Sequence, residues 1–128
     1  GDFDTAVATL KYTDGRLVVI KNSRRAAYGY DQRIEILGSK GLLQVQNVVE
    51  DGIIKSTEMG VQSSKPEYFF LERYKVAYQE EWAAFVSAVQ MKEHVPVSLA
   101  DGIAALAIAE AAAVSAETGS EVKIAKFL

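Results

Sequence analysis

The sequence contains no cysteine and only one histidine, His94, among its 128 residues. Without cysteine, the chain forms no disulfide, has no thiolate nucleophile and binds no metal through sulfur. A single histidine also excludes a pair of histidine ligands to a metal. His94 lies just before Pro96, where a capping or surface role is typical, so we expect neither a catalytic nor a metal-binding role for it. The lack of cysteine agrees with a reducing compartment, and we expect the protein to be cytoplasmic.

A glycine-rich nucleotide-binding motif is also missing. Neither a Gly-x-Gly-x-x-Gly turn nor a Walker-type loop occurs anywhere in the chain. The nearest cluster, Gly38-Ser39-Lys40-Gly41, joins two expected strands and is not followed by a helix. It is typical of a hairpin turn rather than a phosphate cradle. We therefore expect no cofactor-binding residue in this chain.

The charge and hydropathy patterns exclude two further classes of protein. The net charge is only −3, and the arginines are dispersed without aromatic neighbours for stacking, so we expect no nucleic-acid partner. The longest apolar stretch, residues 102–115, is rich in alanine, contains Glu110 and is too short to span a bilayer. No secretory signal opens the chain. The length and the 49% hydrophobic content predict one soluble domain, residues 1–128.

The first two-thirds of the chain has the alternating pattern of β-strands. Asp14-Gly15 is typical of a hairpin turn. We expect a polar loop over residues 60–66 and a final strand around Val122 and Ile124. Earlier strands are expected at residues 5–11, 17–23, 34–37, 42–45 and 53–58. Tight connections between them indicate antiparallel pairing.

Two helices are expected after this region. The first has an apolar stripe with helical spacing and ends near His94 and Pro96. The stripe consists of Tyr74, Tyr78, Trp82, Phe85 and Val89. The second begins at a capping box formed by Ser98 and Asp101 and stops at Gly119.

Together these elements predict an α+β fold. We expect an open, mainly antiparallel sheet with two helices packed on one face. The strands carry apolar residues toward both faces, Val7, Val19 and Ile20 among them. The second face therefore requires its own cover, and we expect a partner subunit there, in a homo-oligomer.

Nucleophilic catalysis has little support in the sequence. Ser23, Ser98 and Ser115 have no base within their own segments, and Ser98 is better explained as a helix cap. Glu80 and Glu81 point about 100° apart on a helix, so they are expected to be solvated rather than paired. We therefore expect no catalytic residue and no metal ligand on this chain.

The most informative segment is residues 22–33, Asn-Ser-Arg-Arg-Ala-Ala-Tyr-Gly-Tyr-Asp-Gln-Arg. Tyr28 and Tyr30 flank a glycine and present two hydroxyls and two flat faces, which suits a polyhydroxylated ring. In the alternative interpretation, these tyrosines cap a sheet edge or a subunit contact, and Asp31 and Arg33 form a structural ion pair. Residue chemistry alone leaves both open.

This segment, with residues 69–74, 77–78 and 96–102, resembles the carboxy-terminal domain of inositol 2-dehydrogenases, in the glucose–fructose oxidoreductase and inositol dehydrogenase family. The resemblance spans essentially the whole chain. It implies an amino-terminal Rossmann domain, absent from this chain, that binds NAD. It also implies catalytic Lys, Asp and His residues that cannot be mapped here, because Gln90 rather than Asp lies four residues before His94. What carries over is Tyr28 and Tyr30 as substrate-binding residues.

The resemblance therefore implies the substrate-side and oligomerisation domain of an NAD-dependent oxidoreductase that acts on a polyol such as myo-inositol, giving 2-keto-inositol. The chain alone is expected to be inactive. The alternative is a stand-alone, non-catalytic dimerisation module. The exact polyol, the choice between NAD and NADP, the tyrosine that faces the substrate, and dimer or tetramer stay open at this point.

Overall fold

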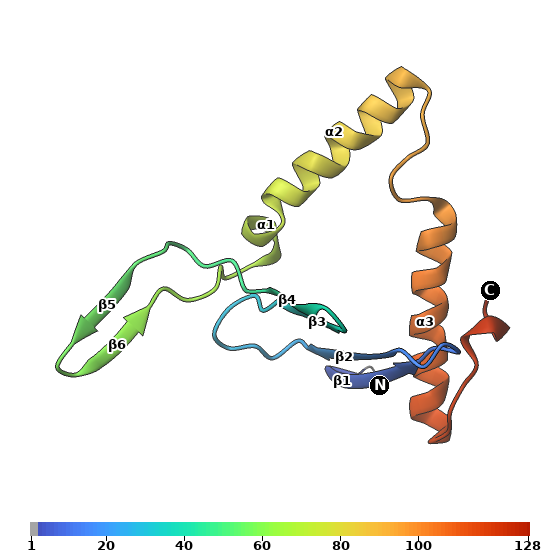
Figure 1. Cartoon of the computed structure of the whole chain (residues 1–128), viewed down its shortest axis with the longest axis horizontal. Helices are drawn as coiled ribbons and strands as arrows, with labels where there is room; N and C mark the ends of the chain where they lie inside the picture. Colours follow the sequence, from blue (N-terminus) through green and yellow to red (C-terminus); the bar gives the residue numbers. More distant parts are fainter. Residues whose placement is uncertain (1–2) are drawn as a thin grey trace. The chain divides into compact units, whose positions relative to one another are not determined.

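The computed structural model describes residues 3–128, which divide into two units between Tyr78 and Gln79. The first unit holds six strands and a short helix, and the second holds most of helix α2, helix α3 and a final 3-10 turn (Figure 1). The boundary between the units falls inside α2. The expectation of one domain stays a prediction.

The strands of the first unit pair as hairpins. Strand β1 (Thr5–Lys11) pairs antiparallel with β2 (Leu17–Ser23), from Thr5 opposite Ser23 to Lys11 opposite Leu17. The turn between them contains Gly15 with a φ of 90°, the positive φ that favours glycine. Strand β3 (Ile34–Gly38) pairs in the same way with β4 (Gly41–Val45). These four strands confirm the predicted ones to within a residue.

The third hairpin corrects one prediction. Residues expected to form a polar loop instead contain strand β6 (Gly60–Ser63), which pairs antiparallel with β5 (Ile54–Thr57). Its sequence, Gly-Val-Gln-Ser, has too little apolar alternation to be recognised alone, and pairing with β5 supplies its backbone partners. The chain then returns through an isolated bridge between Val49 and Pro66.

The next segment is helical, as the apolar spacing predicts. A short helix α1 (Phe70–Arg73) leads directly into α2 (Lys75–Met91), and the amide of Tyr78 donates to the carbonyl of Tyr74 at 2.9 Å. Helix α2 ends before His94, and Lys92 follows it with a φ of 57°.

Helix α3 (Leu99–Thr118) begins and ends as the sequence predicts. The Ser98 side chain accepts from the amide of Asp101, whose carboxylate accepts from the amide of Ser98, and Gly119 ends the helix with a φ of 65°. The expected last strand is wrong. Residues Ile124–Lys126 form a 3-10 turn, η1, and no strand among the described residues pairs with this segment.

The length of α3 also corrects a prediction. The helix extends beyond residues 102–115 on both sides, so by length and composition it could cross a membrane. One such helix is weak evidence, because the core helix of a soluble protein has the same properties. The expectation of no membrane partner stays a prediction.

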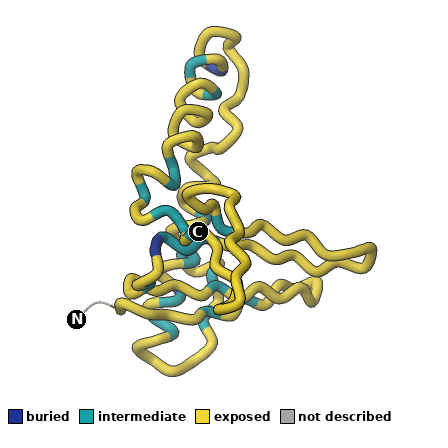
Figure 2. Tube along the Cα trace, turned by 90° about the vertical axis from the view of Figure 1, so that its left-hand side faces the viewer, coloured by how far each residue is buried: buried dark blue, intermediate teal, exposed yellow. Residues whose placement is uncertain are grey.

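Very little of the described chain is buried. Ala88, Ala107 and Ala111 are the buried hydrophobic residues, and nearly the whole trace is exposed (Figure 2). The accessible surface is 11420 Å². Two separate compact bodies of half this mass would expose only about 8,000 Å² together. The structure therefore exposes about 3,000 Å² more surface than two compact bodies would. Because the comparison already treats the units as separate, this excess does not depend on how they are placed relative to each other.

The α+β class with antiparallel strands is confirmed. The single open sheet is not seen: among the described residues, the strands form three two-stranded sheets. Each hairpin satisfies its inner backbone groups locally, and its outer edges pair with no further strand within residues 3–128. The packing of helices on a sheet face stays a prediction.

Candidate functional site

The segment between β2 and β3, which contains both predicted tyrosines, is held by backbone contacts to a distant part of the first unit. Gly29 is buried and has a φ of 126°. A Cβ atom at this position would lie 2.7 Å from the carbonyl oxygen of Pro66 and 3.0 Å from that of Glu67. The amide of Tyr30 donates to the Glu67 carbonyl at 2.7 Å. Only glycine permits this close approach, so the position between the tyrosines fixes where both of them lie.

Tyr30 points toward the start of the helical region. Its hydroxyl lies 3.3 Å from the hydroxyl of Tyr74, and the two rings meet edge to face with centroids 5.4 Å apart. The hydrogen bond to Tyr74, followed by partial desolvation, raises the pKa of Tyr30 above its ordinary value. Tyr30 is therefore a neutral hydroxyl at physiological pH.

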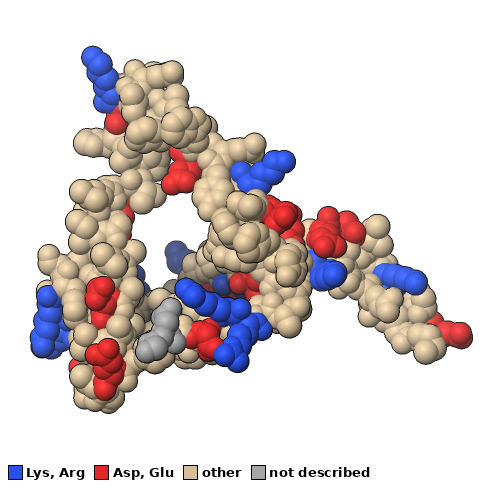
Figure 3. All heavy atoms as spheres, turned by 180° about the vertical axis from the view of Figure 1, so that it is seen from behind, with Lys and Arg blue, Asp and Glu red and all other residues tan. Residues whose placement is uncertain are grey.

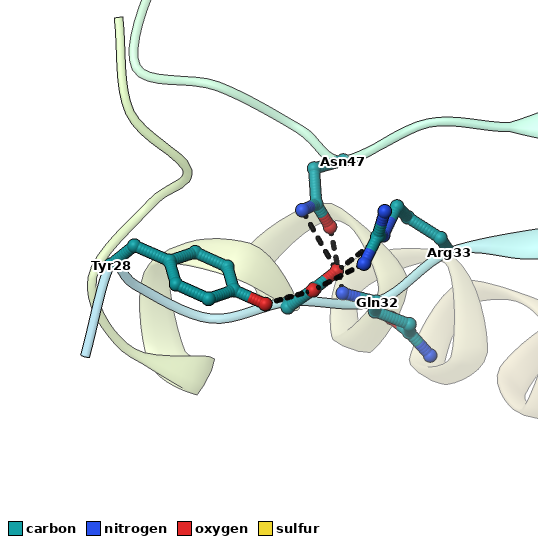
Figure 4. Close-up of polar contacts among 5 residues, drawn as sticks. Tyr28, Gln32, Arg33 and Asn47 are labelled. Carbon is teal, nitrogen blue, oxygen red and sulfur yellow. Dashed lines mark hydrogen bonds and ion pairs between the residues drawn. The ribbon is translucent and has the colours of Figure 1, made fainter. Parts of the chain in front are cut away.

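Tyr28 belongs to a different network, centred on the Asp31 carboxylate (Figure 4). The Tyr28 hydroxyl donates to Asp31 Oδ2. Arg33 donates Nε to Oδ1 and an Nη to Oδ2, each at 2.8 Å. Asn47 donates to Oδ1 at 2.9 Å, and its own oxygen accepts from the amide of Gln32 at 2.7 Å. Three side chains from two parts of the chain thus hold one carboxylate through four hydrogen bonds.

This network changes the pKa values of its members. The hydrogen bonds from Arg33 and then Tyr28 lower the pKa of Asp31 to about 2, so the carboxylate is ionised at physiological pH. The hydrogen bond that Tyr28 donates to Asp31 raises the pKa of Tyr28, because it stabilises the protonated hydroxyl, and desolvation and the negative charge of Asp31 act in the same direction. The ion pair predicted between Asp31 and Arg33 is confirmed, and it is part of the tyrosine network rather than separate from it.

Both tyrosines line one broad, open hollow in the first unit. The hollow is bounded by β1, β2, the segment after β2, β3, β4 and residues 68–69. Its polar lining includes hydroxyls, amides and charges of both signs, contributed by Asn22, Ser23, Arg25, Asp31, Glu35 and Gln44. On the face shown in Figure 3, Lys and Arg side chains lie among Asp and Glu side chains rather than in one basic region. This lining suits a neutral, hydroxyl-rich ligand better than a polyanion.

The other sequence candidates have structural roles. Ser98 caps α3, the Ser115 hydroxyl donates to the carbonyl of Ser120 at 2.7 Å, and Ser23 shares a hydrogen bond with Thr5. Glu80 and Glu81 are exposed, as predicted. Among residues 3–128, no group of three potential metal-binding side chains comes together.

Sequence reasoning missed two members of the site, Asn47 and Tyr74. Asn47 lies 16 residues after Asp31 and comes near it only through the β3–β4 hairpin. Tyr74 was recognised as a member of the helical stripe, and its place beside Tyr30 depends on the contact between residues 29–30 and 66–67. A polar residue just after a strand is a weak signal that could have indicated Asn47.

Comparisons with known proteins identify the family of the chain. A family model described as "Oxidoreductase family, C-terminal alpha/beta domain" matches residues 1–124. The chain belongs to this family. It is 46% identical over 128 residues to the myo-inositol 2-dehydrogenase of Thermotoga maritima, covering all of this chain and 38% of that protein. It is 39% identical over 125 residues to the inositol 2-dehydrogenase of Rhizobium meliloti, covering 98% of this chain and 38% of that protein.

Solved structures of family members support the fold as well. The crystal structure of a "probable dehydrogenase" from Thermotoga maritima matches with a TM-score of 0.92 and 46% identity, over 98% of this chain and 38% of that one. The chain thus spans little more than a third of the length of the relatives it matches, and corresponds to part of an oxidoreductase. The resemblance to the inositol dehydrogenase family is confirmed.

Proposed function

We propose that this chain is the substrate-side and subunit-contact domain of an NAD-dependent dehydrogenase that oxidises a polyol such as myo-inositol to the corresponding ketone. The observation that carries the proposal is the placement of Tyr28 and Tyr30 in one hollow, together with relatives named as inositol 2-dehydrogenases. Two neutral hydroxyls among amides and mixed charges recognise a polyhydroxylated ring through hydrogen bonds.

The described residues do not fit a dinucleotide. Gly38 ends β3 and Gly41 begins β4, one on each side of a hairpin turn, and no helix follows directly to offer its amino terminus to a pyrophosphate. In the proposed enzyme the cofactor is therefore held by another part of the polypeptide. The residues of this chain bind and orient the polyol, and the group that takes its hydroxyl proton lies elsewhere.

Tyr28 and Tyr30 have different tasks in this proposal. Tyr28 lines the hollow and is 54% exposed, whereas Tyr30 is half-buried against Tyr74. Tyr28 is thus the tyrosine with more surface available for a ligand, and Tyr30 contributes a hydroxyl from the wall of the hollow.

The strands support the second part of the proposal, a homo-oligomer. Leu17, Val18 and Val19 are consecutive in β2 and therefore point to alternate faces, yet each is exposed. The exposed surface exceeds that of two compact bodies by about 3,000 Å², which is more than one partner contributes to an interface of standard size. We propose that a second copy covers the strand faces and that the enzyme acts in the cytoplasm.

Two experiments test the proposed function. The coding sequence upstream of Gly1 should continue in frame into a strand, a glycine-rich turn and a helix, whereas an in-frame stop codon would favour the stand-alone module. Titration of this chain alone with NAD should show no binding. Saturable binding would mean that this chain has a nucleotide site. It would contradict the proposal that this chain binds the polyol while another part of the polypeptide binds the cofactor.

A further inference from the structure

The two tyrosine hydroxyls in the hollow have partners of different kinds. Tyr28 bonds to the ionised carboxylate of Asp31, and Tyr30 bonds to another hydroxyl, that of Tyr74. A hydroxyl has one proton to donate and lone pairs to accept with. The partner of each tyrosine therefore determines which role is left for a ligand.

The Tyr28 hydroxyl donates its hydrogen bond to Asp31. A carboxylate accepts and does not donate, so Asp31 accepts the hydrogen bond from the Tyr28 hydroxyl, and the Tyr28 oxygen is left as an acceptor. Arg33 and Asn47 keep Asp31 in place and ionised through three further hydrogen bonds. The Asp31 side chain is only 16% exposed, so water competes weakly for it.

Tyr30 has no such restriction. Either hydroxyl of the Tyr30–Tyr74 pair can donate to the other, because each carries a proton and lone pairs. Reversing this bond allows Tyr30 to donate to a ligand or to accept from it. The site thus combines one hydroxyl of fixed role with one of adjustable role.

We infer that Asp31 is a positioning residue that makes Tyr28 an obligate hydrogen-bond acceptor, so that the site requires a ring hydroxyl able to donate at this point. This inference rests on the proposed function. It adds a specificity rule for ligands that carry an ether, a carbonyl or fluorine where the substrate has that hydroxyl. With such a ligand, the Tyr28 oxygen faces another hydrogen-bond acceptor, and neither of the two can donate.

A double-mutant cycle in the whole enzyme tests this role, with myo-inositol as the substrate. Tyr28→Phe should raise the KM by about three- to tenfold, the loss of one hydrogen bond. Asp31→Asn should raise it as well. The double variant should be no worse than the worse single variant, because Asp31 acts through Tyr28. Asp51→Asn is the matched control: Asp51 also accepts from a hydroxyl and an amide, from Ser64 and Ile53, but outside the hollow, and its loss should leave the KM unchanged.

The outcomes separate this inference from the proposed function. An unchanged KM in Tyr28→Phe would contradict both. A KM that rises in Tyr28→Phe, with effects of the two substitutions that multiply in the double variant, would overturn only the positioning role of Asp31.

A second measurement does not require Asp31→Asn to fold. Monodeoxyfluoro analogues of myo-inositol replace a donating hydroxyl with an atom that cannot donate. Wild type should show a penalty in kcat/KM at one ring position that is lost in Tyr28→Phe and kept in Asp51→Asn. Penalties that are identical in wild type and Tyr28→Phe at every position would overturn the inference.

Discussion

The segment between β2 and β3 and helix α3 are stabilised in opposite ways. Directional contacts surround the segment: Gly29 packs against backbone, and Asp31 accepts four hydrogen bonds from three side chains. Helix α3 has good caps but buries only Ala107 and Ala111, while Leu99 and Leu106 are largely exposed. Because alanine buries little area, the helix gains little from this chain. Residues of this chain thus hold the candidate site together, whereas its apolar helices have large uncovered surfaces.

The largest expected effect is at the exposed helix surface. Trp82 is 66% exposed in this chain, and Phe85 beside it on α2 is also exposed. If the rest of the enzyme covers this face, Trp82→Ala should destabilise the whole enzyme by about 3–5 kcal/mol. Chemical denaturation followed by circular dichroism measures this. A cost below about 0.5 kcal/mol, typical of a surface substitution, would mean that the face is free.

The next effect is at the segment itself. Gly29→Ala should destabilise the protein by about 2–4 kcal/mol, because it adds about 1 kcal/mol of strain from the positive φ to about 1–3 kcal/mol of steric overlap. Gly15→Ala is the matched control, since Gly15 has a φ of 90° but no atom within 4 Å of an added Cβ. It should therefore show the strain alone. Equal losses in the two variants would mean that the contact with Pro66 and Glu67 is not tight.

Acid should weaken the segment between β2 and β3 through Asp31. The folded-state pKa of Asp31 is about 2, below its ordinary value of 3.8, so its stabilisation is complete above that value and is lost as the pH falls toward 2. The free energy of unfolding should therefore decrease between about pH 4 and pH 2. Asp31→Asn should make this decrease shallower, as denaturation at each pH can measure. An identical slope in the variant would mean that Asp31 is not the group that titrates.

The smallest effect is expected at the ion pair of Arg16 and Asp14, whose side chains are 71% and 53% exposed. Its Nε–Oδ2 distance of 2.8 Å is as short as those between Arg33 and Asp31. Water screens the exposed pair, so Asp14→Asn should leave the free energy of unfolding almost unchanged. A larger loss would show that distance rather than burial determines the strength of these pairs.

The sequence was sufficient for elements with strong local signals. The β1–β2 turn, the capping box of Ser98 and the stop at Gly119 depend on residues close in the chain, and all were predicted correctly. Strand β6 was missed because its four residues have little apolar alternation and depend on β5 for pairing. The expected strand at Val122 does not form, since the described chain offers no strand beside it.

The same distinction applies to the site. Tyr28, Tyr30, Asp31 and Arg33 were recognised because they lie in one short segment of unusual composition. Asn47 is brought to Asp31 by a hairpin, and Tyr74 to Tyr30 by a backbone contact, so neither association can be recognised from sequence spacing.

The central claim is that this chain completes a polyol pocket with two tyrosine hydroxyls. Its most direct test is the steady-state kinetics of the whole enzyme with myo-inositol, for wild type and for Tyr28→Phe combined with Tyr30→Phe. Tyr12→Phe is the control, because Tyr12 does not line the hollow. We predict that kcat/KM falls by about tenfold or more in the double variant, the loss of two hydrogen bonds, and is unchanged in the control. Equal kcat/KM values in wild type and the double variant would contradict the account.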